Sequence, residues 1–139
     1  MDAEGNFLGD ILKYTANLIP EDKLRFALGI GTTEDIRRCA KMGWDMFDCV
    51  IPTREGRHGR LFIGSKNKNK SSCKTINILN SKFADYFKPI NPDSSLKELR
   101  EHTIAYLHHL FKLKEPLGHR LSALNNLEYY LNLVKNIKS

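Results

Sequence analysis

The sequence predicts an α/β fold in which short buried strands alternate with helices. Residues 25–31 ("RFALGIG") and 45–51 ("DMFDCVI") are two apolar runs, and a helical pattern lies between them with short connections. Both runs carry apolar residues on both faces, as strands of a parallel sheet covered by helices do. A complete (β/α)8 barrel needs about 250 residues. The chain of 139 residues therefore holds only part of one if these are barrel strands.

Each element up to residue 51 has its own signal. Residues 7–19 place most of their apolar side chains on one helical face, and Pro20 ends that helix. The run at 25–31 closes on glycines, which predicts a buried strand that enters a tight turn. A threonine cap and an acidic first turn predict the next helix over about 32–42. The run at 45–51 is then expected to be the second buried strand.

The remainder of the chain is predicted to form a hairpin and two helices. Residues 61–64 and 75–78 read as its two strands, joined by a long basic tip. A capping-box pattern that begins at Ser95 opens a helical stripe over 95–111. A second stripe follows over 117–134, and we expect the two helices to pack as an antiparallel pair.

The composition excludes several classes of protein. No apolar stretch approaches the ~18–20 residues that a membrane span needs, so no membrane partner is expected. The first ten residues are acidic and polar, which argues against a signal or transit peptide and favours the cytoplasm. Cys39, Cys49 and Cys73 are widely scattered, which argues against a disulfide framework.

Positive charge is concentrated between residues 54 and 74. The excess of this segment equals the net charge of the whole chain, +6. A concentrated basic segment suggests contacts with phosphates; the alternative is a solvated loop that lysines keep soluble. The basic residues of the segment are Arg54, Arg57, Arg60, Lys66, Lys68, Lys70 and Lys74, against the single acidic residue Glu55.

Asp48 stands within the apolar run at 45–51, where a strand interior is expected. An ionised carboxylate in such a place costs several kcal/mol unless it is paired or hydrogen-bonded. Two interpretations are open: a structural aspartate that neighbouring loops satisfy, or a carboxylate that the protein uses chemically.

Four stretches together resemble the tRNA-guanine transglycosylases, the base-exchange enzymes of the queuosine and archaeosine pathways. They are "DMFDCVIPTREGRHGRLF", "LIPEDKLRFALGIGTTEDI", "INILNSKFADYFKPI" and "AYLHHLF". The resemblance runs from about residue 9 to the C-terminus but covers only the C-terminal third or so of the family's protein. It implies the last two βα units of a TIM-like barrel over 1–60, a hairpin with a basic loop over 61–90 and a helical subdomain over 91–139.

The resemblance also implies a chemistry. Asp48 falls on the family's nucleophile, which displaces guanine from the wobble position of tRNA and is itself displaced by a deazaguanine base. Arg54 and Arg57 match positions that hold the tRNA anticodon loop, and their alternative role is that of solvated loop arginines. Leu28 and Gly29 match one side of the guanine pocket, although core packing would also explain Leu28. For Asp45 we expect only a cap on neighbouring backbone at the start of the strand.

A structural zinc is implied by the resemblance, but its ligands are missing. By register, the family's three thiolates fall on Ser94, Leu96 and Leu99, and its histidine falls on Asn125. Leucine cannot bind zinc, so we expect no metal and a subdomain that is held together by apolar packing. Structural zinc contributes folding energy, which some other interaction must then replace.

Two functions follow as expectations. In the first, the chain is the C-terminal part of a transglycosylase and is inactive without the upstream barrel, because the family's other guanine-recognising residues lie upstream. In the alternative, it is a non-catalytic module that binds tRNA, not DNA, or docks on a full-length homologue. A decaying gene remnant is disfavoured, because drift would erode the unbroken amphipathic stripes and the caps.

Overall fold

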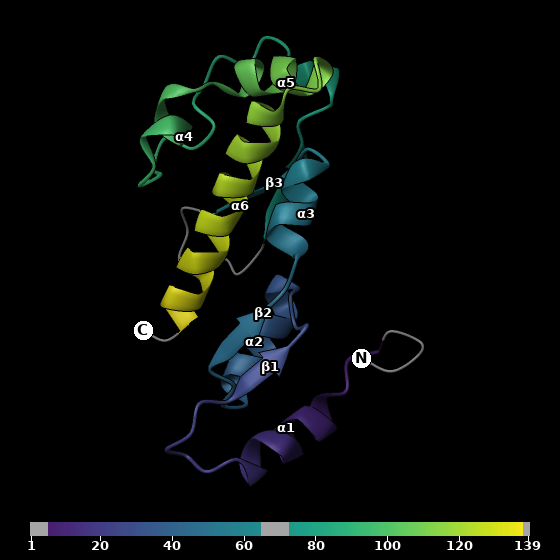
Figure 1. Cartoon of the computed structure of the whole chain (residues 1–139), viewed down its shortest axis with the longest axis vertical. Helices are drawn as coiled ribbons and strands as arrows, with labels where there is room; N and C mark the ends of the chain where they lie inside the picture. Colours follow the sequence, from purple (N-terminus) through teal and green to yellow (C-terminus); the bar gives the residue numbers. More distant parts are fainter. Residues whose placement is uncertain (1–5, 65–72, 138–139) are drawn as a thin grey trace. The chain divides into compact units, whose positions relative to one another are not determined.

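In the computed structural model the chain forms two compact units, which are described separately. The structure describes residues 6–64 and 73–137 (Figure 1). Unit 1 comprises residues up to Ile51 together with those from Leu133 onward, and unit 2 is Pro52–Asn132. The described elements are, in chain order, α1 (Gly9–Leu18), β1 (Phe26–Leu28), α2 (Thr33–Lys41), β2 (Met46–Asp48), α3 (Ile51–Arg57), β3 (Arg60–Ile63), β4 (Lys74–Asn77), the 3-10 turn η1 (Ser81–Phe83), α4 (Lys97–Glu101), α5 (Ile104–Lys112) and α6 (Pro116–Ile137). None of the described helices is long and apolar enough to cross a membrane.

Unit 1 contains the predicted strand–helix–strand motif. β1 and β2 pair in parallel, with Phe26 opposite Met46 and Leu28 opposite Asp48. Thr32 caps α2, because its hydroxyl accepts a hydrogen bond from the backbone N–H of Asp35. The mixed α/β class predicted from the sequence is therefore confirmed.

The expectation that both strands are buried on both faces is wrong for this chain. Only the middle residue of β1, Ala27, is buried, while Phe26 and Leu28 on either side of it are exposed. Met46 and Asp48 are likewise the exposed residues of β2. Side chains two apart in a strand share a face, so one face of this two-stranded sheet packs into the unit and the other is open.

The predicted second strand is also too long. Val50 lies outside β2 and is exposed, and Ile51 begins helix α3. Pro52 explains the change, because proline lacks the N–H that a strand ladder needs and suits the first turn of a helix. Apolar character at 50–51 favours a buried strand, but the proline outweighs it.

Helix α1 is apolar on two sides, where the sequence suggested one. Ala16 is buried, and Leu12 packs on the same small core as Trp44. The side chains of Ile11, Tyr14 and Leu18 are exposed, and their spacing places them on one face of the helix. α1 thus leaves an apolar stripe without a covering element among the described residues of its unit.

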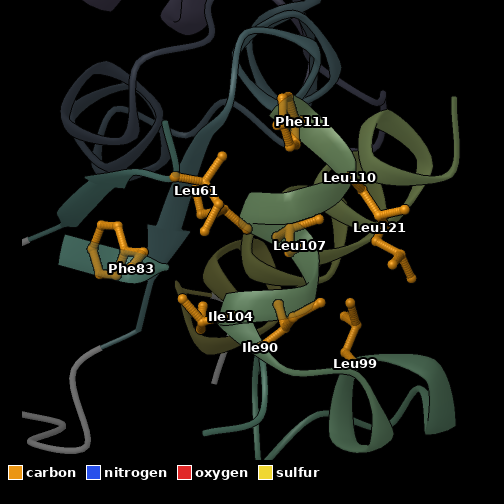
Figure 2. Close-up of a cluster of buried hydrophobic side chains, with 10 residues drawn as sticks. Leu61, Phe83, Ile90, Leu99, Ile104, Leu107, Leu110, Phe111 and Leu121 are labelled. Carbon is orange, nitrogen blue, oxygen red and sulfur yellow. The ribbon is translucent and has the colours of Figure 1, made fainter. Parts of the chain in front are cut away.

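Unit 2 holds the larger core (Figure 2). The predicted hairpin is confirmed, since β3 and β4 pair antiparallel with Leu61 opposite Ile76. One face of the hairpin meets α5 and α6. The buried residues of this cluster are Leu61, Ile78, Phe83, Ile90, Leu99, Ile104, Leu107, Leu110, Phe111 and Leu121.

The predicted single helix over 95–111 is two helices, α4 and α5. The chain breaks between them because the backbone of residues 102–104 pairs with an extended segment instead: Ile90 N–H donates to His102 O, and Ile104 N–H donates to Lys88 O. Thr103 then caps α5 by accepting a hydrogen bond from the N–H of Tyr106. The antiparallel pairing predicted for this helix is wrong as well, because α5 lies across the start of α6 (Figure 1).

Two adjacent buried amides on α6 hold strand β3. Asn126 Oδ1 accepts a hydrogen bond from Phe62 N–H at 2.9 Å, and Asn125 Nδ2 donates to Phe62 O at 3.1 Å. Asn126 Nδ2 also donates to Pro52 O and to Arg60 O, both at 2.9 Å. The edge of β3 that faces away from β4 is thereby satisfied by side chains, as an unpaired strand edge must be when it is buried.

Helix α3 approaches α6 very closely. A Cβ added at Gly56 would lie 2.9 Å from the backbone nitrogen of Ala123. Only glycine fits this contact, and it brings α3, β3 and α6 together around the Asn126 amide.

We expect Asn126→Ala to destabilise unit 2 by about 2–4 kcal/mol, because it leaves buried backbone groups without partners. Urea denaturation followed by circular dichroism measures this loss. Asn132→Ala, at an exposed position of the same helix, is the matched control and should change the unfolding free energy by less than about 0.5 kcal/mol. Equal effects of the two substitutions would show that the amide network contributes little.

Candidate functional site

Asp48 ends strand β2 and faces the neighbouring strand. Its Oδ1 accepts a hydrogen bond from the backbone N–H of Gly29 at 3.0 Å. Gly29 has a φ of 71°, in the left-handed region that glycine adopts without strain, and it turns the chain directly after β1. The exits of the two parallel strands thus meet at this carboxylate.

The cost of burial that the sequence suggested for Asp48 is not present in this chain. The side chain is exposed, in line with its place on the open face of the sheet. Its position at the carboxyl end of a strand agrees with the prediction, while the premise of an uncompensated buried charge is wrong. The physical reason is that nothing among the described residues of unit 1 covers this face.

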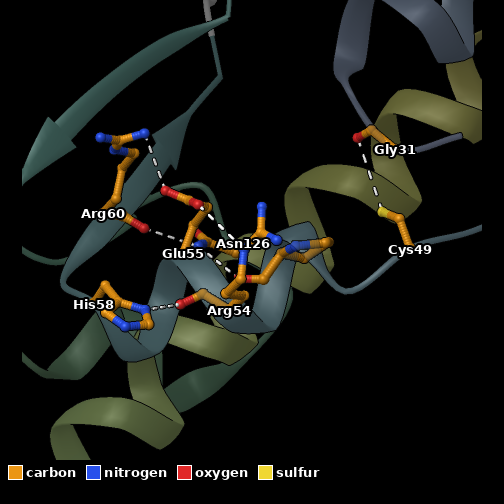
Figure 3. A network of polar contacts seen from close by, with 8 residues as sticks. Gly31, Cys49, Arg54, Glu55, His58, Arg60 and Asn126 are labelled. Atoms are coloured by element: carbon orange, nitrogen blue, oxygen red, sulfur yellow. Dashed lines mark hydrogen bonds and ion pairs between the residues drawn. The ribbon is translucent and has the colours of Figure 1, made fainter. Parts of the chain in front are cut away.

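A tight contact keeps the loops after β1 and β2 together. A Cβ added at Gly31 would lie 2.4 Å from Cys49 Cβ, closer than any real contact. The Cys49 thiol points at the carbonyl oxygen of Gly31, with 3.8 Å between Sγ and O (Figure 3). Because Cys49 directly follows Asp48, this contact fixes the backbone that carries the carboxylate.

The neighbours of Asp48 on the open face are apolar. Leu28, directly opposite it, is 73% exposed, so the interpretation of Leu28 as a core residue is wrong in this chain. A place in a base pocket stays a prediction for Leu28 and Gly29. Asp45 at the other end of β2 does what was expected of it, because its Oδ2 accepts a hydrogen bond from the backbone N–H of Arg25 at 3.1 Å.

The predicted arginines lie in unit 2, on α3 and at the start of β3. Arg54, Arg57 and Arg60 are all exposed. Glu55 contacts two of them: its Oε2 lies 3.0 Å from Arg60 Nη1 and its Oε1 lies 3.6 Å from Arg54 Nε (Figure 3). Arg57 makes no ion pair with a described residue. Lys66, Lys68 and Lys70 lie outside the described residues, so their role in binding stays a prediction.

Sequence reasoning missed Glu55 and the two amides of α6. In a net-charge count, Glu55 is only one negative charge against a basic segment. Its separation of five residues from Arg60, across the turn at Gly59, was the available signal for an ion pair. Asn125 and Asn126 interrupt an apolar helical stripe, and such polar residues are buried only with hydrogen-bond partners.

Comparison with known proteins identifies the family. The family model described as "TGT: Queuine tRNA-ribosyltransferase" matches residues 4–139. The chain belongs to this family. The resemblance to the tRNA-guanine transglycosylases, noted from the motifs around Asp48, is therefore confirmed.

Relatives of the queuine tRNA-ribosyltransferase family in Francisella tularensis are similar over most of the chain. Proteins named queuine tRNA-ribosyltransferase from subspecies novicida (strain U112) and tularensis (strain SCHU S4 / Schu 4) are each 42% identical over 128 residues, or 92% of this chain. The protein of that name from subspecies mediasiatica (strain FSC147) is 41% identical over the same length. The chain spans about a third, 33%, of the length of these relatives.

The residues at the four positions that match the family's zinc ligands do not fit a zinc ion. Leu99 is fully buried in the core of unit 2, and Leu96 packs against the same core. The amide nitrogen of Asn125 already donates to Phe62 O. Among residues 6–64 and 73–137 there is also no group of three or more histidine, cysteine, aspartate or glutamate side chains that could hold a metal.

A carboxylate on α6 holds the loop that contains Ser94, one of the positions that match the family's zinc ligands. Glu128 Oε2 accepts a hydrogen bond from Ser94 Oγ at 2.5 Å. Its Oε1 accepts from the backbone N–H of Ser95 at 2.7 Å and from Ser95 Oγ at 2.6 Å. Arg100 in turn donates to Ser94 O at 2.7 Å. We call these four residues the Glu128 clamp. Ser95 thus binds Glu128 and is not the helix cap that the sequence suggested.

The clamp changes the titration of its carboxylate. Burial raises the pKa of Glu128, but the hydrogen bonds from Ser94 and Ser95 and the charge of Arg100 together outweigh burial and hold the pKa below its ordinary value. Hydrogen bonds to the ionised form have this effect because they stabilise the charge.

We expect the purified chain to contain no stoichiometric zinc, because the side chains at the ligand positions are Ser94, Leu96, Leu99 and Asn125. Elemental analysis of protein prepared without chelator tests this, and the melting temperature should not change on addition of EDTA. One zinc per chain, lost on chelation together with thermal stability, would show that other residues bind the metal.

We expect Glu128→Gln to lower the unfolding free energy at neutral pH by about 1–3 kcal/mol, because charge-assisted hydrogen bonds are lost. A carboxyl with a depressed folded-state pKa stabilises the fold above its unfolded pKa, about 4.3, and this contribution disappears as pH falls through the folded value. The difference between wild type and variant should therefore shrink below about pH 4.

Thermal melts between neutral pH and about pH 3 measure this difference. Glu101→Gln is the matched control, since Glu101 is exposed and pairs only with Lys97 among the described residues. A difference between wild type and Glu128→Gln that stays constant over the whole pH range would show that the charge of Glu128 is not what the clamp uses.

Proposed function

We propose that the chain supplies the nucleophile and part of the tRNA grip for exchange of the wobble guanine of tRNA against a deazaguanine base, as in queuosine-type modification. The observation that carries this proposal is the position of Asp48. It stands at the carboxyl ends of two parallel strands, oriented by the Gly29 N–H at 3.0 Å, where active sites of α/β barrels lie.

The proposed reaction is a double displacement. A carboxylate oxygen of Asp48 attacks the anomeric carbon of the wobble nucleotide, and the bond from that carbon to guanine breaks with its electron pair on the leaving base. The departing guanine takes up a proton at the nitrogen that it frees. The incoming base gives up its ring N–H proton, attacks the same carbon and releases the carboxylate, so that protons and charge balance. A carboxylate suits this role because it captures an oxocarbenium-like centre, as in retaining glycosidases. No cofactor is needed in this sequence of steps.

The open face of the sheet points to a missing neighbour. Phe26, Leu28 and Met46 lie beside Asp48 and are exposed, and the outer edges of β1 and β2 have no strand beside them among the described residues. Exposed apolar faces and unpaired strand edges are surfaces that proteins normally cover. We propose that these strands are the last two of a TIM-like barrel, and that the remaining strands correspond to the length by which the relatives exceed this chain.

The arginines of unit 2 are proposed to hold the tRNA anticodon loop. Guanidinium groups bind phosphate oxygens with two parallel hydrogen bonds, and Arg54, Arg57 and Arg60 are exposed on adjacent elements. Lys66, Lys68 and Lys70 would add charge to the same segment. The proposed place of action is the cytoplasm.

A non-catalytic docking module is the alternative. The exposed apolar stripe of α1, formed by Ile11, Tyr14 and Leu18, favours a protein partner as well, and a full-length homologue would provide one. The two functions differ in whether Asp48 forms a covalent bond with tRNA.

The test is covalent capture of tRNA when the chain is combined with the upstream part of a Francisella relative, fused or co-expressed. We expect wild type to form an adduct that survives a denaturing gel and Asp48→Asn to form none. Asp48→Asn should leave the unfolding free energy of the chain within about 1 kcal/mol, because the exposed side chain makes one backbone hydrogen bond that asparagine can also accept.

Asp85→Asn is the matched control, because Asp85 is an exposed loop aspartate; it should capture tRNA as wild type does. The chain alone should form no adduct. Absence of capture in the combined protein, for wild type and variant alike, would favour the docking module.

A further inference from the structure

Two of the arginines that the proposed function assigns to RNA are already paired in the free protein. Both carboxylate oxygens of Glu55 are engaged, Oε2 with Arg60 Nη1 at 3.0 Å and Oε1 with Arg54 Nε at 3.6 Å. The contacts run between α3 and the first residue of β3 (Figure 3). The guanidinium groups nevertheless stay accessible, since the side chains of Arg54 and Arg60 are 51% and 56% exposed.

The Glu55 carboxylate is held in place from both sides. Its own side chain is only 20% exposed. The next residue, Gly56, is pressed against the backbone of α6 at Ala123, which fixes the helix that carries Glu55. The carbonyl of Arg60 is bound by Asn126 Nδ2 at 2.9 Å, which fixes the strand on the other side. The backbones that carry Glu55 and Arg60 are therefore fixed relative to each other, so the carboxylate remains near the arginines even when its side chain rotates away from them.

A phosphate of RNA competes for the same donors. Carboxylate and phosphate oxygens accept hydrogen bonds from guanidinium in the same geometry. A phosphate that approaches Arg60 must displace Glu55 from it and must remain close to an uncompensated negative charge. Arg57, which makes no ion pair with a described residue, is the guanidinium of this group that a phosphate can bind without such competition.

We propose that Glu55 is an internal counter-ion which the RNA phosphates must displace, and that it keeps RNA binding by this segment weak. The inference rests on the proposed RNA contact of Arg54, Arg57 and Arg60. It adds that affinity and salt dependence are set by a carboxylate within the binding surface. RNA would thereby dissociate readily from the arginines, because Glu55 forms its ion pairs with Arg54 and Arg60 again as the phosphates leave.

The salt dependence of binding distinguishes this role from a structural one. For single-stranded nucleic acid, the slope of log affinity against log salt changes by about 0.7 for each phosphate that is neutralised. When Glu55 is neutral, Arg54 and Arg60 neutralise phosphate fully, so the slope should steepen. A change that only stabilised or loosened α3 would alter affinity without changing the slope.

The experiment measures fluorescence anisotropy of a labelled synthetic tRNA anticodon stem-loop with guanine at the wobble position, titrated with the full 139-residue chain at several KCl concentrations. Glu55→Gln should bind about 3–10-fold more tightly than wild type at low salt, with a slope steeper by about 0.7–1. Glu55→Ala, a second neutral variant with high helix propensity, should behave in the same way.

Two controls complete the design. Glu55→Asp keeps the negative charge and should bind within about twofold of wild type. Glu101→Gln removes the same charge from the whole chain but at a site distant in sequence, on α4, so its affinity and slope should match wild type. Urea melts of each variant confirm that it is folded at the assay temperature.

The outcomes separate the two proposals. Salt-dependent RNA binding by wild type that neither neutral variant strengthens would overturn the counter-ion role and leave the RNA contact intact. An equal gain for Glu55→Gln and Glu101→Gln would also overturn it, because overall charge would then be the cause. No salt-dependent binding by any of the proteins would overturn the RNA contact together with the counter-ion role.

Discussion

The arrangement of unit 2 depends on the hydrogen bonds of the Asn126 side-chain amide. One side chain binds the backbone of α3 at Pro52 and the backbone of β3 at Arg60 and Phe62. It replaces the strand that would otherwise pair with the outer edge of β3, and it is fully buried. A buried amide that satisfies both its donor and its acceptor groups specifies one arrangement, because any shift of the helix leaves several backbone groups unpaired. The close contact at Gly56 is possible only in that arrangement.

Much of the fold could be predicted because local signals and packing agree. Thr32 opens α2 and Gly43, with a φ of 93°, follows its end, so capping chemistry alone located that helix. The hairpin was predicted from two short runs, 61–64 and 75–78, that a long basic tip joins. The errors at 45–51 and at 95–111 have a common cause. In both segments the prediction rested on the hydrophobic pattern alone and left out the hydrogen bonds of the backbone. Pro52 cannot donate to a ladder, and residues 102–104 bond to an extended segment that is distant in sequence from α4.

The position of Asp48 in the candidate site was predicted correctly, but its burial was not. The motif around Asp48 identified the family and placed the carboxylate at the end of a strand, as found. Its burial was inferred from neighbours in sequence, but burial depends on what lies over the sheet, and periodicity carries no information on that. Glu55 shows the reverse case. Its role depends on Arg60, which lies across a turn from it. In a net-charge count the two opposite charges cancel, so the count does not show that they form an ion pair.

The Glu128 clamp affects which solution conditions the stability of the helical part of the chain responds to. A loop that is tied by a metal has a stability which rises with the free concentration of that metal, because binding to the folded state shifts the equilibrium by mass action. A loop that is tied by its own carboxylate has no such concentration dependence. The partner is always present at unit stoichiometry, and its effective concentration is set by the chain itself. The Glu128 carboxylate thereby couples folding of this loop to acidity.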